Sequence, residues 1–236
     1  MTGADPKLNL NGDMGVRAYA DCETMDWQAS PSGSVWRKRL HLVGGAESGQ
    51  VTSIVRYDPN ASFPAHDHPG GEEILVLEGV FSDDHGDWPE GTYLLNPEGF
   101  RHAPFSKNGC VIFVKLRQYD GPDRKHVALC VDDESWRSSE IPGIECKTLY
   151  DETPYPETTR LERWAAGTAP GELPAGDGFE ILILEGMLRD EHATYRKGAW
   201  LRLPAGASYV PYTPKGCVVY RKSGALAQLH SGSSAD

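Results

Sequence analysis

The sequence of 236 residues lacks the long apolar runs that mark membrane proteins. No stretch approaches the roughly 20 apolar residues that a membrane-spanning helix requires. The first residues, MTGADPKLNLNGD, contain no basic segment followed by an apolar one, as a signal peptide would. We therefore expect a cytoplasmic protein without a membrane partner.

Basic residues are also scarce. The chain has 23 Lys and Arg against 34 Asp and Glu, which gives a formal net charge of -11. A surface that binds the phosphate backbone needs clustered positive charge. The composition therefore argues against a nucleic acid as partner.

Cysteine is present but is not arranged for cross-linking or for metal binding. The five cysteines are odd in number, are scattered, and form no C-x-x-C pair: Cys22, Cys110, Cys130, Cys146 and Cys217. A disulfide framework or a cysteine zinc cage is therefore not expected. We expect reduced cysteines that serve packing.

Long helical periods are absent, and short apolar runs bounded by Gly, Pro, Asp and Asn take their place. Four examples are VTSIVRY (51–57), EEILVLEG (72–79), GTYLLNP (91–97) and CVIFVKLRQY (110–119). Runs of this length and composition are typical of β-strands, although DDESWRSS (132–139) could start a short helix. The pattern predicts an all-β sandwich or barrel with polar tails at both ends, MTGADPKLNLNG and HSGSSAD (230–236).

An internal repeat sets the number of domains. The 43 residues from Glu73 to Lys115 align without a gap with those from Glu180 to Lys222, at an offset of 107 residues. The sequence therefore predicts two tandem barrels, a first domain at 15–120 and a second at 121–228. A linker is expected around residues 120–145.

Two histidines and a glutamate precede the first repeat's central strand. His66 and His68 are two residues apart, so on a strand both side chains point to the same face. The Pro-Gly-Gly turn that follows lets the chain reverse and brings back Glu72, and a second hairpin brings in His102. Three imidazoles and one carboxylate in one cavity would suit Zn, Fe, Mn, Cu or Ni.

These residues match the two cupin motifs. HDHPGGEEILVLEG fits H-x-H-x3-E-x6-G, and GTYLLNPEGFRH fits G-x5-P-x-G-x2-H. The sequence resembles the ChrR-like cupins in particular, here duplicated as a bicupin. The resemblance implies jelly-roll barrels and metal ligation by His66, His68, Glu72 and His102. In that family the cupin holds zinc and follows an anti-sigma domain, but here the segment before the barrel is short, so a sigma-factor partner is not expected for this chain alone.

The second repeat lacks the ligand residues. At the offset of 107, Tyr209 replaces His102 and Phe179 replaces Glu72, and ELPAGDG (172–178) contains no histidine. We therefore expect a metal-free second barrel that serves packing or binds a small apolar molecule.

Other residues also recur between the copies. Glu73, which recurs as Glu180, is expected to be solvated or to lie between the barrels. His85, which recurs as His192, is expected to make a structural hydrogen bond. Cys110 and Cys217 are expected in the cores.

The sequence leaves two functions open. Four protein ligands on an octahedral metal leave two positions, enough for a chelating diketone or hydroxyketone and for dioxygen, which favours a dioxygenase-like enzyme. The runner-up is a ChrR-like zinc cupin that acts as a stress sensor or regulatory binding module. Both need one divalent transition metal, Zn or Fe(II) with Mn or Ni as alternatives, and a small-molecule ligand. No general base or nucleophile stands out beyond the four ligands, and a homodimer is conceivable.

Overall fold

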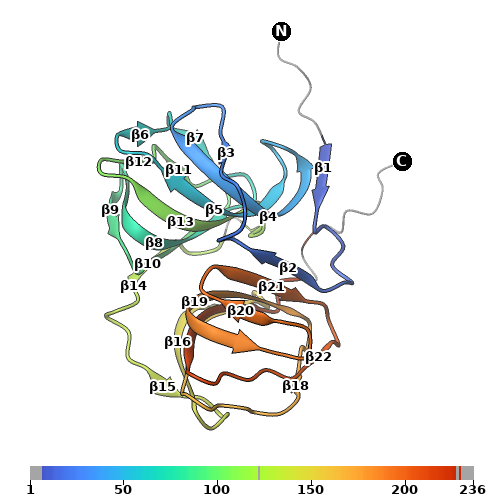
Figure 1. Ribbon diagram of the computed structural model, residues 1–236. Helices are drawn as coiled ribbons and strands as arrows, with labels where there is room; N and C mark the ends of the chain where they lie inside the picture. Colours follow the sequence, from blue (N-terminus) through green and yellow to red (C-terminus); the bar gives the residue numbers. More distant parts are fainter. Residues whose placement is uncertain (1–6, 122, 227–228, 230–236) are drawn as a thin grey trace. The chain divides into compact units, whose positions relative to one another are not determined.

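The structure, a computed structural model, describes residues 7–121, 123–226 and Leu229. Within these ranges it consists of β-strands and turns, and it contains neither an α-helix nor any helix that could span a membrane (Figure 1). The all-β prediction is confirmed. The helix considered at 132–139 is wrong, because this segment forms a turn and then strand β15 (Arg137–Ser138).

The expected tails fare differently. Residues 230–236 lie outside the described part of the chain. At the other end, the polar tail is wrong from residue 7 onward, because Lys7–Leu10 forms strand β1 and pairs with β4 (Val35–Gly45).

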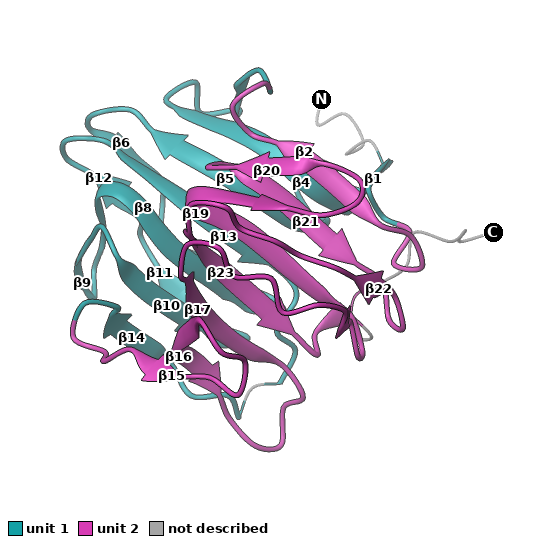
Figure 2. Cartoon of the chain, turned by 60° about the horizontal axis from the view of Figure 1, so that its bottom comes forward, with its two compact units in different colours: residues 1–12, 25–132, 230–236 teal, residues 13–24, 133–229 magenta. Residues whose placement is uncertain are grey.

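The first compact unit contains residues 7–12 and 25–132 (Figure 2). Its main antiparallel sheet has the order β1-β4-β5-β13-β8-β10-β14, and two shorter strands, β7 and β11, pair separately. The bounds not yet given are β3 (Gln28–Ala29), β5 (Gln50–Tyr57), β6 (Ala61–Ser62), β7 (His66–Asp67), β8 (Glu72–Asp83), β9 (Gly86–Pro89), β10 (Thr92–Asn96), β11 (Arg101–His102), β12 (Phe105–Ser106), β13 (Cys110–Leu116) and β14 (Val127–Cys130).

The second compact unit contains residues 13–24, 133–226 and 229. Its main sheet has the order β15-β16-β17-β23-β19-β21-β2, and β18 pairs separately with β22. The bounds are β2 (Ala18–Asp21), β16 (Ile144–Asp151), β17 (Thr158–Trp164), β18 (Leu173–Pro174), β19 (Phe179–Arg189), β20 (Thr194–Arg196), β21 (Ala199–Leu203), β22 (Ser208–Tyr209) and β23 (Cys217–Ser223).

The two units repeat the same strand register. His66 lies opposite His102 in the first unit, and Leu173 lies opposite Tyr209 in the second. Both central pairs, β8 with β13 and β19 with β23, shift register at the corresponding place. Each number differs from its counterpart by 107, so the sequence repeat is a repeat of structure.

Alternation along the strands fills each barrel. On β13, Cys110, Ile112 and Val114 belong to the buried core of the first unit, and on β23, Cys217 and Val219 belong to that of the second. Burial of each large apolar side chain contributes about 1.5 to 3 kcal/mol. The prediction that Cys110 and Cys217 lie in the cores is confirmed, and all five cysteines are free.

The strand at the start of each sequence repeat belongs to the compact unit formed mainly by the other repeat. Strand β2, from the start of the first repeat, pairs with β21, while β14, from the start of the second, pairs with β10. The copies also match here, because Trp27 packs against Lys38 and Arg56 just as Trp136 packs against Lys147 and Arg163.

The linker expected around residues 120–145 is therefore wrong, because β14 and β15 are formed within it. The compact units also assign residues 13–24 to the second barrel and 121–132 to the first. The ranges 15–120 and 121–228 follow the repeats, and as domain limits they stay a prediction.

A glycine substitution tests the shared hairpin. Gly186 has φ +71°, and an added Cβ would lie 2.2 Å from the Gly216 carbonyl oxygen, so Gly186→Ala should lower the free energy of unfolding by about 2 kcal/mol or more. Gly206→Ala is the control, since φ is +70° but no atom lies within 4 Å, and about 1 kcal/mol is expected. Urea unfolding measures both, and equal losses would contradict the steric argument.

Candidate metal centre

Two hairpins of the first unit bring the four predicted ligands together. His66 on β7 lies opposite His102 on β11. The backbone N–H of His68 donates to the Phe100 carbonyl (2.9 Å), and the N–H groups of Gly71 and Gly99 donate to the His68 carbonyl (3.1 and 3.0 Å). This turn leads directly into β8, whose first residue is Glu72.

The side-chain atoms of these residues converge. Ring nitrogens of His66, His68 and His102 all lie within 4.8 Å of one another. The closest pair is His68 Nε2 and His102 Nε2, 2.8 Å apart, and Glu72 Oε2 lies 3.6 Å from each of these nitrogens. His68, Glu72 and His102 are buried and His66 is half-buried, so the site has one partly exposed side.

The donor set fits a divalent transition metal. Two ligand atoms at about 2.1 Å from one ion and at right angles lie about 3.0 Å apart. The measured His68–His102 separation is close to that value, and the Glu72 separations are slightly wider. Buried imidazoles and a carboxylate this close are costly without a shared cation or proton. As metal ligands the four residues stay a prediction that this geometry favours.

Outer contacts turn the histidines so that the right nitrogen faces the cluster. His102 Nδ1 donates to Asp83 Oδ2 (2.9 Å), and His66 Nδ1 donates to the Pro64 carbonyl (2.8 Å). With Nδ1 carrying the proton, Nε2 keeps its lone pair. The amide of Asn96 similarly holds Glu72 Oε2 (2.9 Å).

The two closest imidazoles have pKa values shifted in opposite directions. Burial lowers the pKa of His68, and the neighbouring His102 and His66 add to this against Glu72. Burial also acts to lower the pKa of His102, but the hydrogen bond to Asp83 and the charge of Glu72 outweigh it and raise the pKa overall. Without a metal, His102 is therefore the more strongly protonated of the pair.

This predicts a pH dependence of metal binding. A metal must displace the proton from His102, whose pKa lies above the ordinary 6.5. Affinity should therefore begin to fall at a higher pH than for an unperturbed imidazole, and it should be strongest on the alkaline side. Competition titrations with a chelator between about pH 8 and pH 5 measure this, and an affinity independent of pH would contradict it.

Sequence reasoning missed Asp83, Asn96, Phe100 and His126. Asp83 also accepts hydrogen bonds from the N–H groups of His85 and Gly86 and from the Trp88 indole. Its recurrence as Asp190 was the available signal. Phe100 stacks on His126, with 5.0 Å between ring centroids. His126 was not predicted because it directly precedes β14, in the segment that was expected to be a linker.

A charge-removing substitution tests the contribution of Asp83. Asp83→Asn should weaken metal binding by about 10- to 100-fold, because the carboxylate no longer orients His102 or raises its basicity. Asp190→Asn, in the same hairpin of the second unit, should leave metal affinity unchanged. Both are measured by competition with a chromophoric chelator, and equal affinities for Asp83→Asn and wild type would contradict the assignment.

The other recurring residues are now placed. Glu73 is only 2% exposed and accepts hydrogen bonds from the hydroxyls of Tyr93 (2.7 Å) and Tyr119, so the expectation that it is solvated is wrong. His85 Nε2 donates to the Arg101 carbonyl (3.0 Å), which confirms its structural hydrogen bond. His192 instead lies 3.3 Å from the carboxylate of Glu191.

The ligand positions of the second unit hold different side chains. Leu173, Ala175, Phe179 and Tyr209 stand where the first unit has His66, His68, Glu72 and His102. Phe179 and Tyr209 are fully buried and pack edge to face, 5.4 Å between centroids.

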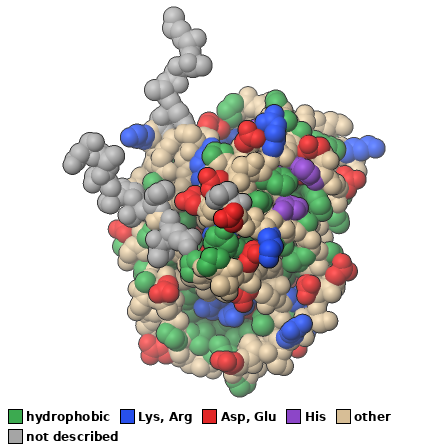
Figure 3. All heavy atoms as spheres, turned by 180° about the vertical axis from the view of Figure 1, so that it is seen from behind, with side chains coloured by type: hydrophobic (Ala, Val, Ile, Leu, Met, Phe, Trp, Pro, Cys, Tyr) green, Lys and Arg blue, Asp and Glu red, His purple; other side chains and the backbone are tan. Residues whose placement is uncertain are grey.

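Figure 3 shows one face of the molecule on which histidine side chains reach the surface beside hydrophobic ones.

Comparison with solved structures supports the fold. A protein from Nostoc punctiforme described as a candidate dioxygenase is 16% identical, with a TM-score of 0.73 over 92% of this chain and 86% of that one. A protein from Pseudomonas aeruginosa described as a candidate glyoxylate-induced protein is 13% identical, with a TM-score of 0.69 over 96% of this chain and 94% of that one. Oxalate decarboxylase of Bacillus subtilis is 12% identical, with a TM-score of 0.62 over 88% and 76%.

No curated protein matches the sequence. The family comparison, in contrast, covers nearly the whole chain: the ChrR Cupin-like domain matches twice, over residues 16–120 and 124–227. The two matches coincide with the repeat, and the first contains the three-histidine cluster. The protein is a bicupin that belongs to the ChrR cupin-like family.

Proposed function

We propose that the protein is a metal-dependent, dioxygenase-like enzyme that acts on a small diketone or hydroxyketone at the centre in the first unit. The observation that carries this is the convergence of three imidazoles and one carboxylate in a barrel with a partly exposed side. The resemblance in fold to a candidate dioxygenase supports it.

The residues of the chain would divide the work. His66, His68, Glu72 and His102 would hold one divalent metal, Fe(II) in this proposal, which supplies a Lewis acid and a template for a chelating substrate. Asp83 keeps the proton of His102 on Nδ1, so that Nε2 stays available. Asn96 fixes the Glu72 carboxylate.

Aromatic rings limit the water around the centre. Phe81 and Phe100 lie 6.1 and 5.7 Å from the His102 ring, and Phe63 lies 6.3 Å from the His66 ring, all between centroids. An apolar wall strengthens electrostatic interactions and favours a substrate with little polar surface beyond its chelating oxygens. The half-buried His66 marks the side on which such a substrate would enter.

Metal analysis and oxygen uptake test this proposal together. Protein purified without added metal is analysed for Fe, Zn, Mn and Ni, and oxygen consumption is then measured with small β-diketones and α-hydroxyketones. About one iron per chain with substrate-dependent oxygen uptake is expected. Tightly held zinc without turnover would contradict it.

The family match favours a second candidate, a zinc-holding sensor or regulatory binding module. In that case the same four residues hold zinc and a small stress-derived molecule binds beside it. Zinc content of about one per chain, with a ligand-induced change in thermal stability and no oxygen uptake, would support this candidate over the enzyme.

A further inference from the structure

Two core positions that hold valine in the first barrel hold charged side chains in the second. Val55 and Val114 belong to the buried core of the first unit. At the offset of 107 their places are taken by Glu162 and Arg221, whose side chains are 2% and 11% exposed. A substitution of two buried valines by an acid and a base is costly unless these groups serve an interaction.

Positive charge is in excess in this cluster. Arg160 lies directly opposite Arg221 in the register of β17 and β23, so two like charges face each other. Arg160 binds Glu162 Oε1 closely, with 2.6 Å from Nη2 and 2.7 Å from Nε. Arg221 Nη1 lies 3.8 Å from the same oxygen, beyond hydrogen-bond distance. The indole N–H of Trp164 donates to the other oxygen of Glu162, Oε2 (3.0 Å).

Arg221 is therefore a nearly buried guanidinium whose neighbouring carboxylate is engaged by other donors. Burial lowers its pKa, and Glu162 acts in the opposite direction. The guanidinium carbon of Arg221 lies over the Phe179 ring, 4.1 Å from its centroid, and Nε donates to Ser223 Oγ (3.3 Å). This arrangement holds the fork of N–H donors in one orientation, as sites that bind carboxylates do.

Tyr209, which packs against Phe179, supplies a second hydrogen-bond donor. The Tyr209 hydroxyl is buried and has no hydrogen-bond partner among the residues that the structure describes. The Tyr209 ring packs against the edge of Phe179. A buried hydroxyl without a partner is unfavourable, and an acceptor from a ligand would offset this cost.

Apolar side chains belong to the same core cluster as Phe179 and Tyr209, namely Ala175 within it and Leu173 packed against it. Ala175 stands in place of the His68 imidazole, and Leu173 stands in place of His66. Leu173 lies opposite Tyr209 in the β18–β22 pair. The position that holds polar ligands in the first unit thus carries hydrocarbon and one phenol in the second.

We propose that the second barrel binds a small organic carboxylate, with its carboxylate group on Arg221 and the Tyr209 hydroxyl and its hydrocarbon part against Phe179, Leu173 and Ala175. The carboxylate neutralises the excess positive charge of the cluster and accepts the hydrogen bond that Tyr209 lacks. The three apolar side chains select a monocarboxylate with a short hydrocarbon part over an inorganic anion.

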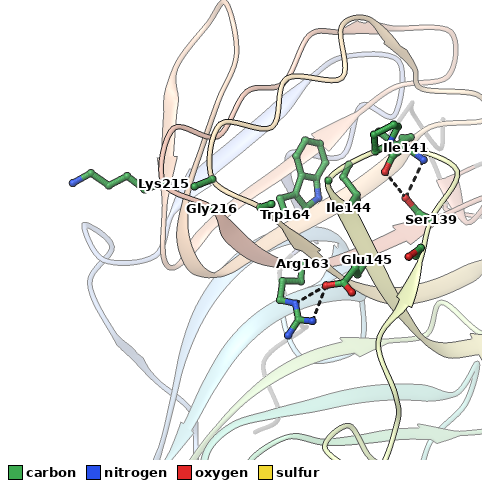
Figure 4. Close-up of a pocket in the computed structure, with 13 residues that line it drawn as sticks. Ser139, Ile141, Ile144, Glu145, Arg163, Trp164, Lys215 and Gly216 are labelled. Atoms are coloured by element: carbon green, nitrogen blue, oxygen red, sulfur yellow. Dashed lines mark hydrogen bonds and ion pairs between the residues drawn. The ribbon is translucent and has the colours of Figure 1, made fainter.

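An open cleft of about 440 Å³ on the same unit is a poorer site for such a ligand. Figure 4 shows that its charged residues Arg163 and Glu145 bind each other (2.6 Å), while Lys215 extends away from the other labelled side chains. The cleft therefore presents no converging donors. It does supply a control, because Arg163 lies on the same strand as Glu162 but on its exposed face.

Calorimetric titration of the full, metal-free chain tests the proposal. The probes are butyrate and benzoate, with chloride and inorganic phosphate for comparison. At least one carboxylate should bind, Arg221→Met should weaken it by about 100-fold and Tyr209→Phe by about 10-fold, and Arg163→Met should leave it unchanged. No carboxylate binding at 10 mM, or equal binding of phosphate, would overturn the proposal.

Tyr209→Phe also keeps the test decisive if Arg221→Met fails to fold. The ligand-free Tyr209→Phe protein should unfold at the same or a higher temperature than wild type, because an unpaired buried hydroxyl is removed. Weaker carboxylate binding with unchanged or increased stability supports a ligand-binding role. Unchanged carboxylate binding by Tyr209→Phe would overturn the proposal. Since no metal or oxygen uptake is involved, the outcome is independent of the proposed enzyme activity.

Discussion

His102→Ala should reduce bound metal to under about a tenth of the wild-type content. His102 is 1% exposed, lies 2.8 Å from His68 and 3.6 Å from Glu72, and is held in place by Asp83. Its loss removes one of three imidazoles and should cost more than the roughly 10- to 100-fold that loss of an outer partner costs. Elemental analysis after dialysis against a weak chelator measures the effect.

His192→Ala is the matched control. His192 is the counterpart of His85 in the second repeat and is exposed in the second unit. Its removal should therefore leave the metal content within error of wild type. A cooperative thermal transition in both variants would exclude unfolding as the cause. Retention of a full equivalent of metal by His102→Ala would show that the centre has been assigned to the wrong residues.

Glu72→Gln should abolish most turnover if the protein is an enzyme. The substitution keeps the shape of the side chain and the contact with Asn96 while it removes the ligand charge. A neutral ligand changes the Lewis acidity of a bound metal, so kcat should fall by about 100-fold or more, equivalent to about 2.7 kcal/mol. Turnover is compared at matched metal occupancy, so that loss of metal is not mistaken for loss of activity.

Tyr209→Phe provides the comparison for this experiment. Tyr209 occupies the position of His102 in the other repeat, and burial raises the pKa of its hydroxyl well above the usual 10, so at neutral pH it stays protonated and is a weak ligand. Turnover at the first centre should remain within a few-fold of wild type. Activity lost with Tyr209→Phe and kept with Glu72→Gln would place the active site in the second barrel.

The sequence predicted the four-residue cluster well because its information is local. His66, His68 and Glu72 follow from the alternation of a strand and one glycine turn, and His102 follows from a second motif of fixed spacing. The repeat likewise predicted two barrels, because the same ungapped pattern of strands and turns occurs twice, and the register shift of β8 indeed recurs in β19.

The sequence did not predict contacts that depend on distant pairing. Asp83 reaches His102 across a hairpin, and His126 reaches Phe100 because β14 pairs with β10, neither of which a periodic pattern encodes. Glu73 was expected to be solvated or to lie between the barrels because it alternates away from the cavity, yet two tyrosine hydroxyls bind it in a buried position. The charges inside the second barrel were missed because Arg221 and Glu162 lie on strands whose apolar neighbours dominate the pattern.

Because β2 pairs with β21 and β14 pairs with β10, the chain cannot be cut between the two sequence repeats without loss of a strand from each sheet. A cut near residue 120 separates each fragment from a strand that its sheet requires, and the fragment containing β21 would present a fully buried strand as a bare edge. Fragments 1–120 and 121–236 should therefore be insoluble or aggregate when produced alone and should recover when produced together. A single repeat produced alone could complete its sheet only by exchanging this strand with a second copy, so we expect any soluble form of it to be a strand-swapped homodimer.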